Sequence, residues 1–275
     1  MQYVFIDNIV STGYIGHTIV KLTDNTLFIT GGGSGIGRGL AEAFHALGNQ
    51  VIIAGRRQDV LDQAADANSG MGTVSIDMSD PAAIEQVAAE LIAHHPALNV
   101  LINNAGISRL EDLANQADSS RAEAMITTNL LGPIRLTSAL LPHFLKQPRA
   151  TIINVTSGLG FVPLPIAPTY SATKAALHSY TQSLRYQLRD TAVEVIEIIP
   201  PYVQTELGGQ AQTVDPRAMP LKDFIAETME NFKKGTPNGE NCVEKVKFLR
   251  DAEATGNFHK AFGMLGQMVI DPSHP

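Results

Sequence analysis

The stretch Thr30-Gly31-Gly32-Gly33-Ser34-Gly35-Ile36-Gly37 follows a short apolar run, Leu27 to Thr30, and opens into a segment of helical period, Ile36 to Leu47. A glycine-rich turn between a strand and a helix lets the backbone come close to a pyrophosphate, whose charge is held by free N–H groups and the positive end of the helix. The alternative is a flexible glycine loop without a ligand. The position of the glycines at a strand-to-helix junction favours a dinucleotide site.

Outward from this turn, apolar runs of strand length alternate with longer segments of helical period. Continuous apolar runs are typical of strands that helices cover on both faces. The expected strands are Leu27 to Thr30, Gln50 to Ala54, Thr73 to Ile76, Val100 to Ile102, Thr151 to Val155 and Val193 to Ile199. The expected helices are Ile36 to Leu47, Arg57 to Ala67, Pro81 to His94, Ser119 to Lys146 and Thr169 to Arg189. We predict an α/β fold, a three-layer, doubly wound parallel sheet in a single domain.

Length and composition limit which functions are possible. The 275 residues are 44% hydrophobic and 17% charged, which is enough apolar material for one large core and unlike the composition of a disordered chain. The net charge of −7 offers no basic footprint for nucleic acid and disfavours an anionic membrane surface. The single cysteine, Cys242, favours a reducing compartment, and no secretory signal or membrane-spanning stretch is recognisable. We expect a cytoplasmic protein with a small-molecule substrate.

The two ends of the chain depart from the β-α pattern. Residues 1–20 precede the first strand, and we expect either a hairpin or a disordered leader there. Glycine and proline recur around a short helical stretch, Leu221 to Lys234, which predicts a substrate loop or lid over about 203–240. Residues 242–265 are expected to form one or two helices. The main domain is therefore expected over 21–275, with residues 1–20 as an extension.

Two arginines follow the second strand, where an NAD-preferring protein offers a carboxylate to the ribose hydroxyls. Arg56 and Arg57 offer two guanidiniums to a 2′-phosphate, and Arg38 offers a third. The alternative for Arg57 is a solvent-facing start of the next helix. Asp77, just past the third strand, is either a ligand of the adenine amino group or a turn residue. The pattern predicts NADP(H) in preference to NAD(H).

Three further side chains carry acid–base chemistry. Tyr170 and Lys174 lie four residues apart in a helical segment, hence on one face of it, although this spacing alone is a weak signal. A tyrosine hydroxyl, with an ordinary pKa of about 10, needs a nearby cation to act near neutral pH. Ser157 follows the fifth strand at the carboxyl edge of the sheet, where ligands of open α/β sheets bind. We expect Ser157 to hold a substrate oxygen beside Tyr170.

Over about residues 22–205 the chain resembles the compact type of the short-chain dehydrogenase/reductase family. The family's TGxxxGxG motif occurs at Thr30–Gly37, its NNAG motif at Asn103–Gly106, and its Ser, Tyr and Lys at the positions above. Asn129, in a long helical segment, matches the family's further catalytic Asn. The stretch Val155 to Ser179 is similar to the DltE-type oxidoreductase subgroup. Four motifs in the family's order are far more specific than any one of them.

The resemblance implies a Rossmann-type oxidoreductase that interconverts a carbonyl and a secondary alcohol. Tyr170 would transfer the proton and Ser157 would orient the reacting oxygen. Lys174 would lower the tyrosine pKa and bond the nicotinamide ribose, and Asn129 would hold a water. The expected cofactor contacts are Gly31, Gly33, Ser34, Gly35, Ile36, Gly37, Arg56, Arg57, Asp77, Met78, Asn104, Ala105, Gly106, Tyr170, Lys174, Pro200, Val203 and Thr205. No metal site is expected, and a homodimer is favoured by analogy.

Some features depart from the family pattern and leave alternatives open. Pro200-Pro201 replaces the usual Pro-Gly and removes an N–H donor, and we expect Thr205 still to reach the carboxamide. The usual seventh strand is not recognisable in Phe258 to Pro275. The apolar residues around Phe161 either line a substrate pocket or only pack its wall. His178 is expected to be a core or interface residue rather than part of a proton relay. The alternative functions are an idle dinucleotide-binding redox sensor or scaffold, and an epimerase or dehydratase.

Overall fold

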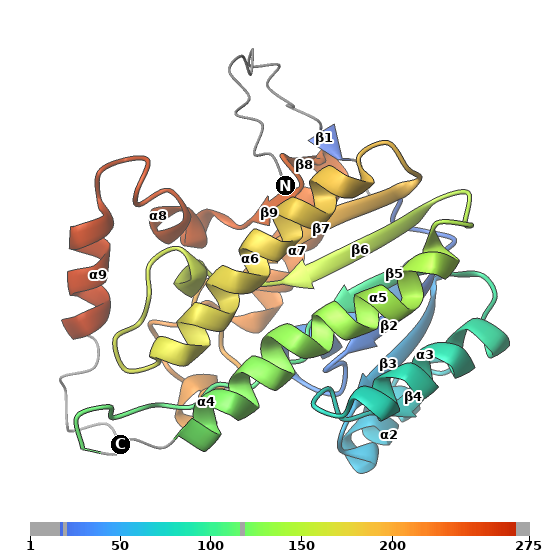
Figure 1. Ribbon diagram of the computed structural model, residues 1–275, viewed down its shortest axis with the longest axis horizontal. Coiled ribbons are helices and arrows are strands. Elements are labelled where there is room, and N and C mark those ends of the chain that lie inside the picture. Colours follow the sequence, from blue (N-terminus) through green and yellow to red (C-terminus); the bar gives the residue numbers. More distant parts are fainter. Residues whose placement is uncertain (1–16, 19–20, 116–118, 268–275) are drawn as a thin grey trace, which may run out of the picture.

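The protein is a seven-stranded sheet between two layers of helices, seen in a computed structural model that describes residues 17–18, 21–115 and 119–267 (Figure 1). The strand order is β4-β3-β2-β5-β6-β7-β9, and every neighbouring pair is parallel. After β4 the chain crosses to the other side of β2 to form β5, so the direction in which strands are added to the sheet reverses between β2 and β5. The doubly wound α/β sheet predicted from the apolar runs is confirmed.

The strands of this sheet are short and mostly buried. Every residue of the central strands β2 and β6 is buried, because helices cover both faces. The strands are β2 (Thr26–Thr30), β3 (Gln50–Gly55), β4 (Gly72–Ser75), β5 (Leu98–Asn103), β6 (Ala150–Val155), β7 (Val193–Ile199) and β9 (Glu240–Cys242). A separate antiparallel pair joins β1 (His17–Thr18) to β8 (Thr236–Pro237).

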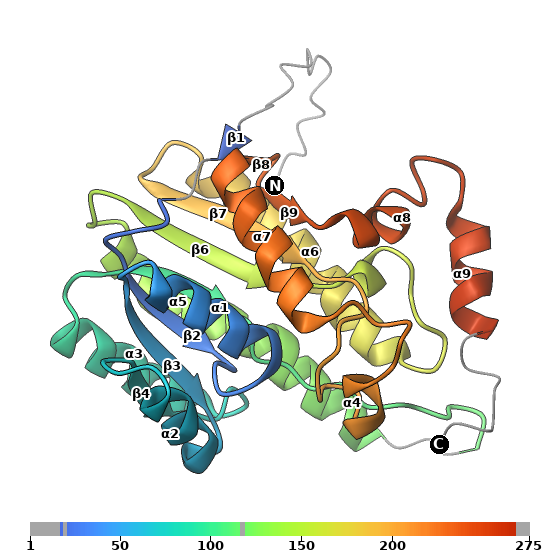
Figure 2. The same cartoon turned by 180° about the vertical axis from the view of Figure 1, so that it is seen from behind.

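Helices of the two layers pack against opposite faces of the sheet (Figures 1 and 2). One layer holds α3 (Pro81–His94), α4 (Ser119–Ile126), α5 (Gly132–Phe144) and α6 (Pro168–Leu188), and the other holds α1 (Gly35–Ala46), α2 (Gln58–Asp66) and α7 (Leu221–Lys234). Two short helices, α8 (Lys247–Arg250) and α9 (Phe258–Gln267), lie beyond the β7 side of the sheet. Each face of the sheet thus has its own apolar cluster.

The predicted loop over 203–240 contains part of this covering layer. Phe224 and Phe232 of α7 are fully buried, and the Phe232 ring lies 6.2 Å from that of Phe44 on α1. Residues 203–220, by contrast, hold only one short 3-10 turn, Gln210–Thr213, and an isolated β-bridge between Val203 and Met219. The helix inside the predicted lid is therefore packed as firmly as the helices of the sheet layers.

Two expectations for the elements are corrected. The helix expected over Ser119 to Lys146 is interrupted: α4 ends at Ile126, a π-helical segment runs over Thr127–Leu131, and α5 follows. The tail is not helical from Cys242, because β9 ends there and pairs in parallel with β7. A seventh strand therefore exists, earlier in the chain than Phe258. A three-residue strand with the sequence Glu-Asn-Cys carries no strand-like alternation, which is why the pattern missed it.

The question of a hairpin or a leader at the N-terminus falls mostly on residues 1–16 and 19–20, which lie outside the described residues. The described part, β1, pairs with β8. Within the described residues, no helix combines the length and apolar character needed to cross a membrane.

Candidate active site

The glycine turn lies at the carboxyl end of β2, at the point where the strand order reverses. Gly31 and Gly35 adopt positive φ angles of 67° and 53°, which favour glycine. A Cβ on Gly37 would overlap the carbonyl oxygen of Gly31 and the Asn104 side chain. Ser34, the N-cap of α1, makes no side-chain capping hydrogen bond, so the cap leaves the first-turn N–H groups for a ligand. The turn fits the pyrophosphate of a dinucleotide.

The Asn103–Gly106 segment braces this turn from the neighbouring strand, β5. The backbone N–H groups of Asn104 and Ala105 both donate to Thr30 Oγ1, each at a distance of 3.1 Å. Asn104 Nδ2 donates to the carbonyl oxygens of Thr30 and Gly31, at 3.0 and 3.2 Å. The side chain of Asn104 is thus a structural brace, and the predicted contact segment lies directly against the glycine turn.

Asn129 is fixed by the loop that leaves this segment. It lies in the π-helical segment, a feature frequent at functional sites, and is only 1% exposed. Its Oδ1 accepts from the N–H of Ile107 and its Nδ2 donates to the Ile107 carbonyl, both at a distance of 2.8 Å. Nδ2 also lies 3.3 Å from Thr173 Oγ1 of α6. Asn129 therefore ties the loop to the helix that carries Tyr170.

Ser157, Tyr170 and Lys174 come together at the carboxyl edge of the sheet. All three are buried, and the hydroxyls of Ser157 and Tyr170 interact by a hydrogen bond. Lys174 Nζ lies 5.7 Å from the centroid of the Tyr170 ring and donates to the carbonyl oxygen of Val155 over 2.8 Å. Residues far apart in the sequence thus form one cluster of a phenol, a hydroxyl and an ammonium.

Burial dominates the acidity of the two titratable groups. Tyr170 packs in an apolar cluster with Met125 and Ala167, and burial raises its pKa to about 12 against the opposing hydrogen bond with Ser157. Burial lowers the pKa of Lys174 to about 8, opposed by the charge of Glu197. The expected lowering of the tyrosine pKa by Lys174 is thus not the dominant effect. At neutral pH the Tyr170 hydroxyl is therefore neutral.

The residues predicted to read the adenosine end lie at the ends of β3 and β4. Arg56 and Arg57 are exposed there. Asp77 accepts from the N–H and hydroxyl of Ser79, at 2.8 and 2.7 Å, which lowers its pKa together with the charge of Arg56. This is the turn arrangement considered for Asp77. Met78 beside it is buried in the core.

Arg38 points elsewhere. Its Nε forms an ion pair with Glu42 over 2.7 Å along α1, so the third guanidinium considered for the 2′-phosphate is engaged on its own helix. Arg56 and Arg57 have the freer positions at the sheet edge.

The loop after β7 reaches back over the glycine turn. Thr205 lies there, because a Cβ on Gly35 would be 3.3 Å from its Cγ2. The carbonyl oxygen of Pro200 accepts from the N–H of Gly158 over 2.9 Å, and Val203 is buried in the core. Of the three residues predicted to contact the nicotinamide end, Thr205 lies at the turn and the other two hold the loop in place.

The apolar residues after Ser157 divide into two groups. Val162 is fully buried against Ala252 and Ala261, so it packs the wall. Leu164 packs against the cluster that contains Tyr170. Packing of the wall is thus confirmed for Val162, and a substrate-lining role for the others stays a prediction.

Two polar residues near Tyr170 were missed from the sequence. Glu111 accepts from the N–H and hydroxyl of Thr169, at 2.9 and 2.8 Å, and so caps the start of α6 from a distant loop. Glu197, on β7, is fully buried and hydrogen-bonds with His178. A charged residue inside the apolar run Val193 to Ile199 was the signal available for Glu197.

Comparisons with known proteins identify relatives. The family model for the short chain dehydrogenase matches residues 25–215. The chain is 40% identical over 237 residues to the uncharacterized oxidoreductase DltE of Bacillus subtilis (strain 168), covering 85% of this chain and 93% of that protein. It is 32% identical over 244 residues to the rat (Rattus norvegicus) dehydrogenase/reductase SDR family member 7B, covering 84% of this chain and 71% of that protein.

Solved structures show the same fold with nicotinamide dinucleotides bound. A serine dehydrogenase in complex with NADP+ is 30% identical, with a TM-score of 0.68 over 73% of this chain and 86% of that one. A short chain dehydrogenase from Burkholderia cenocepacia in complex with NADP is 25% identical, with a TM-score of 0.75 over 88% of this chain and 99% of that one. The chain therefore belongs to the short-chain dehydrogenase/reductase family, in a DltE-like subgroup, and is an NAD(P)-dependent oxidoreductase.

Proposed function

We propose that the protein interconverts a carbonyl and a secondary alcohol with NADP(H). The convergence of Ser157, Tyr170 and Lys174 at the carboxyl edge of the sheet that also carries the glycine turn is the observation that supports this proposal. When bound, the nicotinamide supplies or accepts the hydride. The Ser157 hydroxyl orients the substrate oxygen, and the neutral Tyr170 hydroxyl donates the proton that this oxygen needs. Lys174 holds the ribose end of the cofactor.

Turnover with a panel of aldehydes and ketones tests this activity. We expect the purified protein to oxidise NADPH only when a carbonyl compound is present, with the alcohol as product. NADPH binding without turnover would favour the idle sensor instead. Product formation without net oxidation of NADPH would indicate an epimerase or dehydratase.

Arg56 is the proposed reader of the 2′-phosphate, since it is exposed at the end of β3 beside the turn. We expect Arg56→Asp to weaken NADPH binding by about 10- to 100-fold, the loss of one or two charge-assisted hydrogen bonds. NADH binding should change little, because NADH lacks the phosphate. The measurement is titration calorimetry with both cofactors.

A matched control makes the same charge change far from the cofactor edge. Arg189 contacts Tyr186 at the C-terminal end of α6, and Arg189→Asp should leave both affinities unchanged. An Arg56→Asp protein with the wild-type preference would locate the 2′-phosphate elsewhere.

We infer that residues 203–220 are the part of the predicted lid that closes over the site. Thr205 lies against Gly35, and the Gln212 amide donates to the Val203 carbonyl and to Thr205 Oγ1, at 2.7 and 3.1 Å. Bound cofactor is expected to slow amide hydrogen exchange in 203–220 and to leave the buried face of α7 unchanged. Equal protection of both segments would argue against this division.

A cytoplasmic homodimer remains the proposed state of the protein. By analogy with the family, the helices predicted over Ser119 to Lys146 and Thr169 to Arg189 would pair between two subunits. They carry exposed apolar side chains, including Ile126 at the end of α4 and Tyr186 on α6, which are 41% and 68% exposed. Light scattering on the purified protein should give twice the monomer mass.

A further inference from the structure

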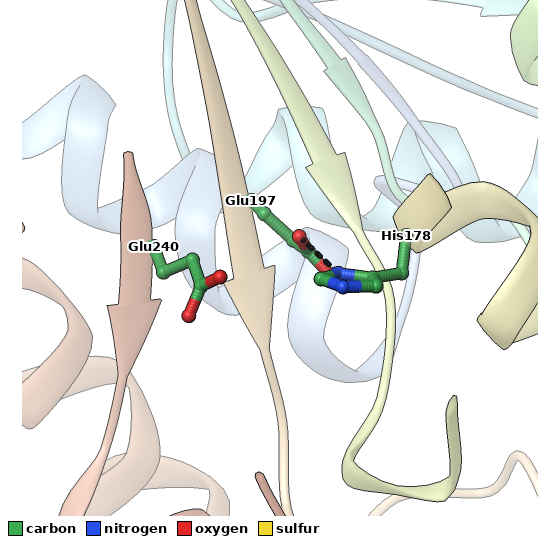
Figure 3. Close-up of side chains that lie close together, drawn as sticks. All are labelled: His178, Glu197 and Glu240. Atoms are coloured by element: carbon green, nitrogen blue, oxygen red, sulfur yellow. Dashed lines mark hydrogen bonds and ion pairs between the residues drawn. The ribbon is translucent and has the colours of Figure 1, made fainter. Parts of the chain in front are cut away.

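A polar stripe continues from the catalytic residues along α6 into the core. Tyr170, Lys174 and His178 follow one another at intervals of four, which places them on one face of the helix. His178 Nδ1 lies 2.8 Å from an Oε2 atom of Glu197 on β7, and Thr156 Oγ1 donates to the same carboxylate over 2.6 Å. Figure 3 shows the His178 ring and the Glu197 carboxylate turned toward each other.

The position of Glu197 makes the negative charge of its carboxylate energetically unfavourable. It is fully buried, and its register partner on β9 is Glu240, another acid, on the same side of the sheet (Figure 3). A buried carboxylate beside a second one destabilises the fold unless each has its own partner. Glu240 has Arg250, whose Nε and Nη2 lie 2.8 and 3.1 Å from its oxygens.

The side chains of His178, Glu197 and Glu240 bring their ligand atoms within 4.8 Å of one another, a geometry that a metal ion can use. Their oxygens are already engaged by protein donors: those of Glu240 by Arg250, and those of Glu197 by Thr156 and His178. The negative charges of Glu197 and Glu240 are therefore compensated by other residues of the protein rather than by a metal ion.

Lys174 is the cation placed to use the Glu197 charge. Its Nζ is held at the carbonyl oxygen of Val155, and the next residue, Thr156, holds Glu197. The charge of Glu197 favours the ammonium form against the effect of burial. The other titratable or charged groups around the pair are Tyr170, His178 and Arg185 on α6, Glu240 and Cys242 on β9, and Arg250 on α8.

We propose that Glu197, oriented by Thr156 and His178, is a positioning residue whose buried negative charge balances the buried ammonium of Lys174. The carboxylate touches neither substrate nor cofactor, and it acts through Lys174 alone. The catalytic importance of this effect rests on the proposed function, whereas the electrostatic link between the two side chains does not.

The direct test is titration of Lys174 in Glu197→Gln, followed by NMR of lysines labelled at Cε and assigned with Lys174→Met. Glutamine keeps the shape of Glu197 and removes its charge. We expect the pKa of Lys174 to fall by about one unit from its wild-type value, the usual effect of losing a nearby opposite charge. Glu194→Gln, on the same strand and paired with Arg149 at the surface, is the control and should leave the titration unchanged. An unchanged Lys174 pKa in Glu197→Gln overturns the proposal.

The pH profile of carbonyl reduction gives a second readout. The ammonium is lost as pH rises through its pKa, so a lower pKa moves the alkaline fall of kcat/KM to lower pH. For a one-unit fall from about 8, Glu197→Gln should lose about threefold at pH 7.5 and almost nothing at pH 6. An equal loss at all pH values would indicate a structural role only. If wild type itself shows no turnover, the proposed function fails while the NMR titration still decides the electrostatic link.

If Glu197→Gln does not fold well enough for NMR, stability decides instead. Denaturation of Glu197→Gln, Lys174→Met and the double variant forms a cycle. We expect the double variant to lose less stability than the sum of the single losses, because each single change strands a buried charge. Additive losses would contradict the link.

Discussion

Replacing Tyr170 with phenylalanine is expected to lower NADPH-dependent carbonyl reduction by about 10³-fold, the usual contribution of a positioned proton donor. The change removes one hydroxyl and leaves the ring in its apolar cluster with Met125 and Ala167, so the fold should survive. The cofactor site at the glycine turn does not depend on this hydroxyl. NADPH affinity measured by fluorescence should therefore stay close to the wild-type value while kcat falls.

Tyr180→Phe is the matched control for this experiment. Tyr180 lies on the same helix and is partly buried, but it packs against the apolar cluster that contains Leu184 and Leu188, not the one that contains Tyr170. Loss of the Tyr180 hydroxyl should leave kcat unchanged. A Tyr170→Phe protein that retains a tenth or more of the wild-type kcat would remove the acid–base role from Tyr170.

The second large effect is expected from Gly37→Ala. The new methyl group would overlap the carbonyl oxygen of Gly31 and the amide of Asn104, which together hold the turn in shape. Because one of these contacts is backbone, the turn has to shift, at a cost of about 1–3 kcal/mol in the free energy of unfolding. The displaced N–H groups would no longer converge on a pyrophosphate, so we expect NADPH binding to fall by at least about 100-fold.

Gly263→Ala separates this effect from the general cost of replacing a glycine. Gly263 lies within α9, and a Cβ there meets nothing within 4 Å. The variant should be as stable as wild type or slightly more so, because alanine favours helix, and its cofactor affinity should be unchanged. Wild-type NADPH affinity in Gly37→Ala would show that the glycine turn does not hold the cofactor.

The fold was predictable because its signals are local. Continuous apolar runs mark the strands of a covered parallel sheet, and the glycines stand where β2 ends and α1 begins. The strand β9 was not predictable, because its three residues become a strand only by pairing with β7. The break in the helix at Thr127–Leu131 was equally hidden, since helical period continues through it and the contacts of Asn129 with Ile107 are tertiary.

The site shows the same division. The spacing of Tyr170 and Lys174 on one helix and the position of Ser157 after β6 were readable from the sequence. The acidity of these groups was not, because it depends on burial and on Glu197, a charge from another strand. The capping of α6 by Glu111 also depends on the folded geometry. The pairing of Arg38 with Glu42, by contrast, is an i,i+4 contact within a predicted helix, and its spacing was readable from the sequence.

The destination of the hydride tests the central claim most directly. NADPH deuterated at the transferable C4 position is incubated with the wild-type protein and a carbonyl that it reduces, and the product is analysed by mass spectrometry. We predict an alcohol with one deuterium on the former carbonyl carbon, formed about 10³-fold more slowly by Tyr170→Phe. A folded wild-type protein that binds NADPH but places no deuterium on any carbonyl of the panel would contradict the account.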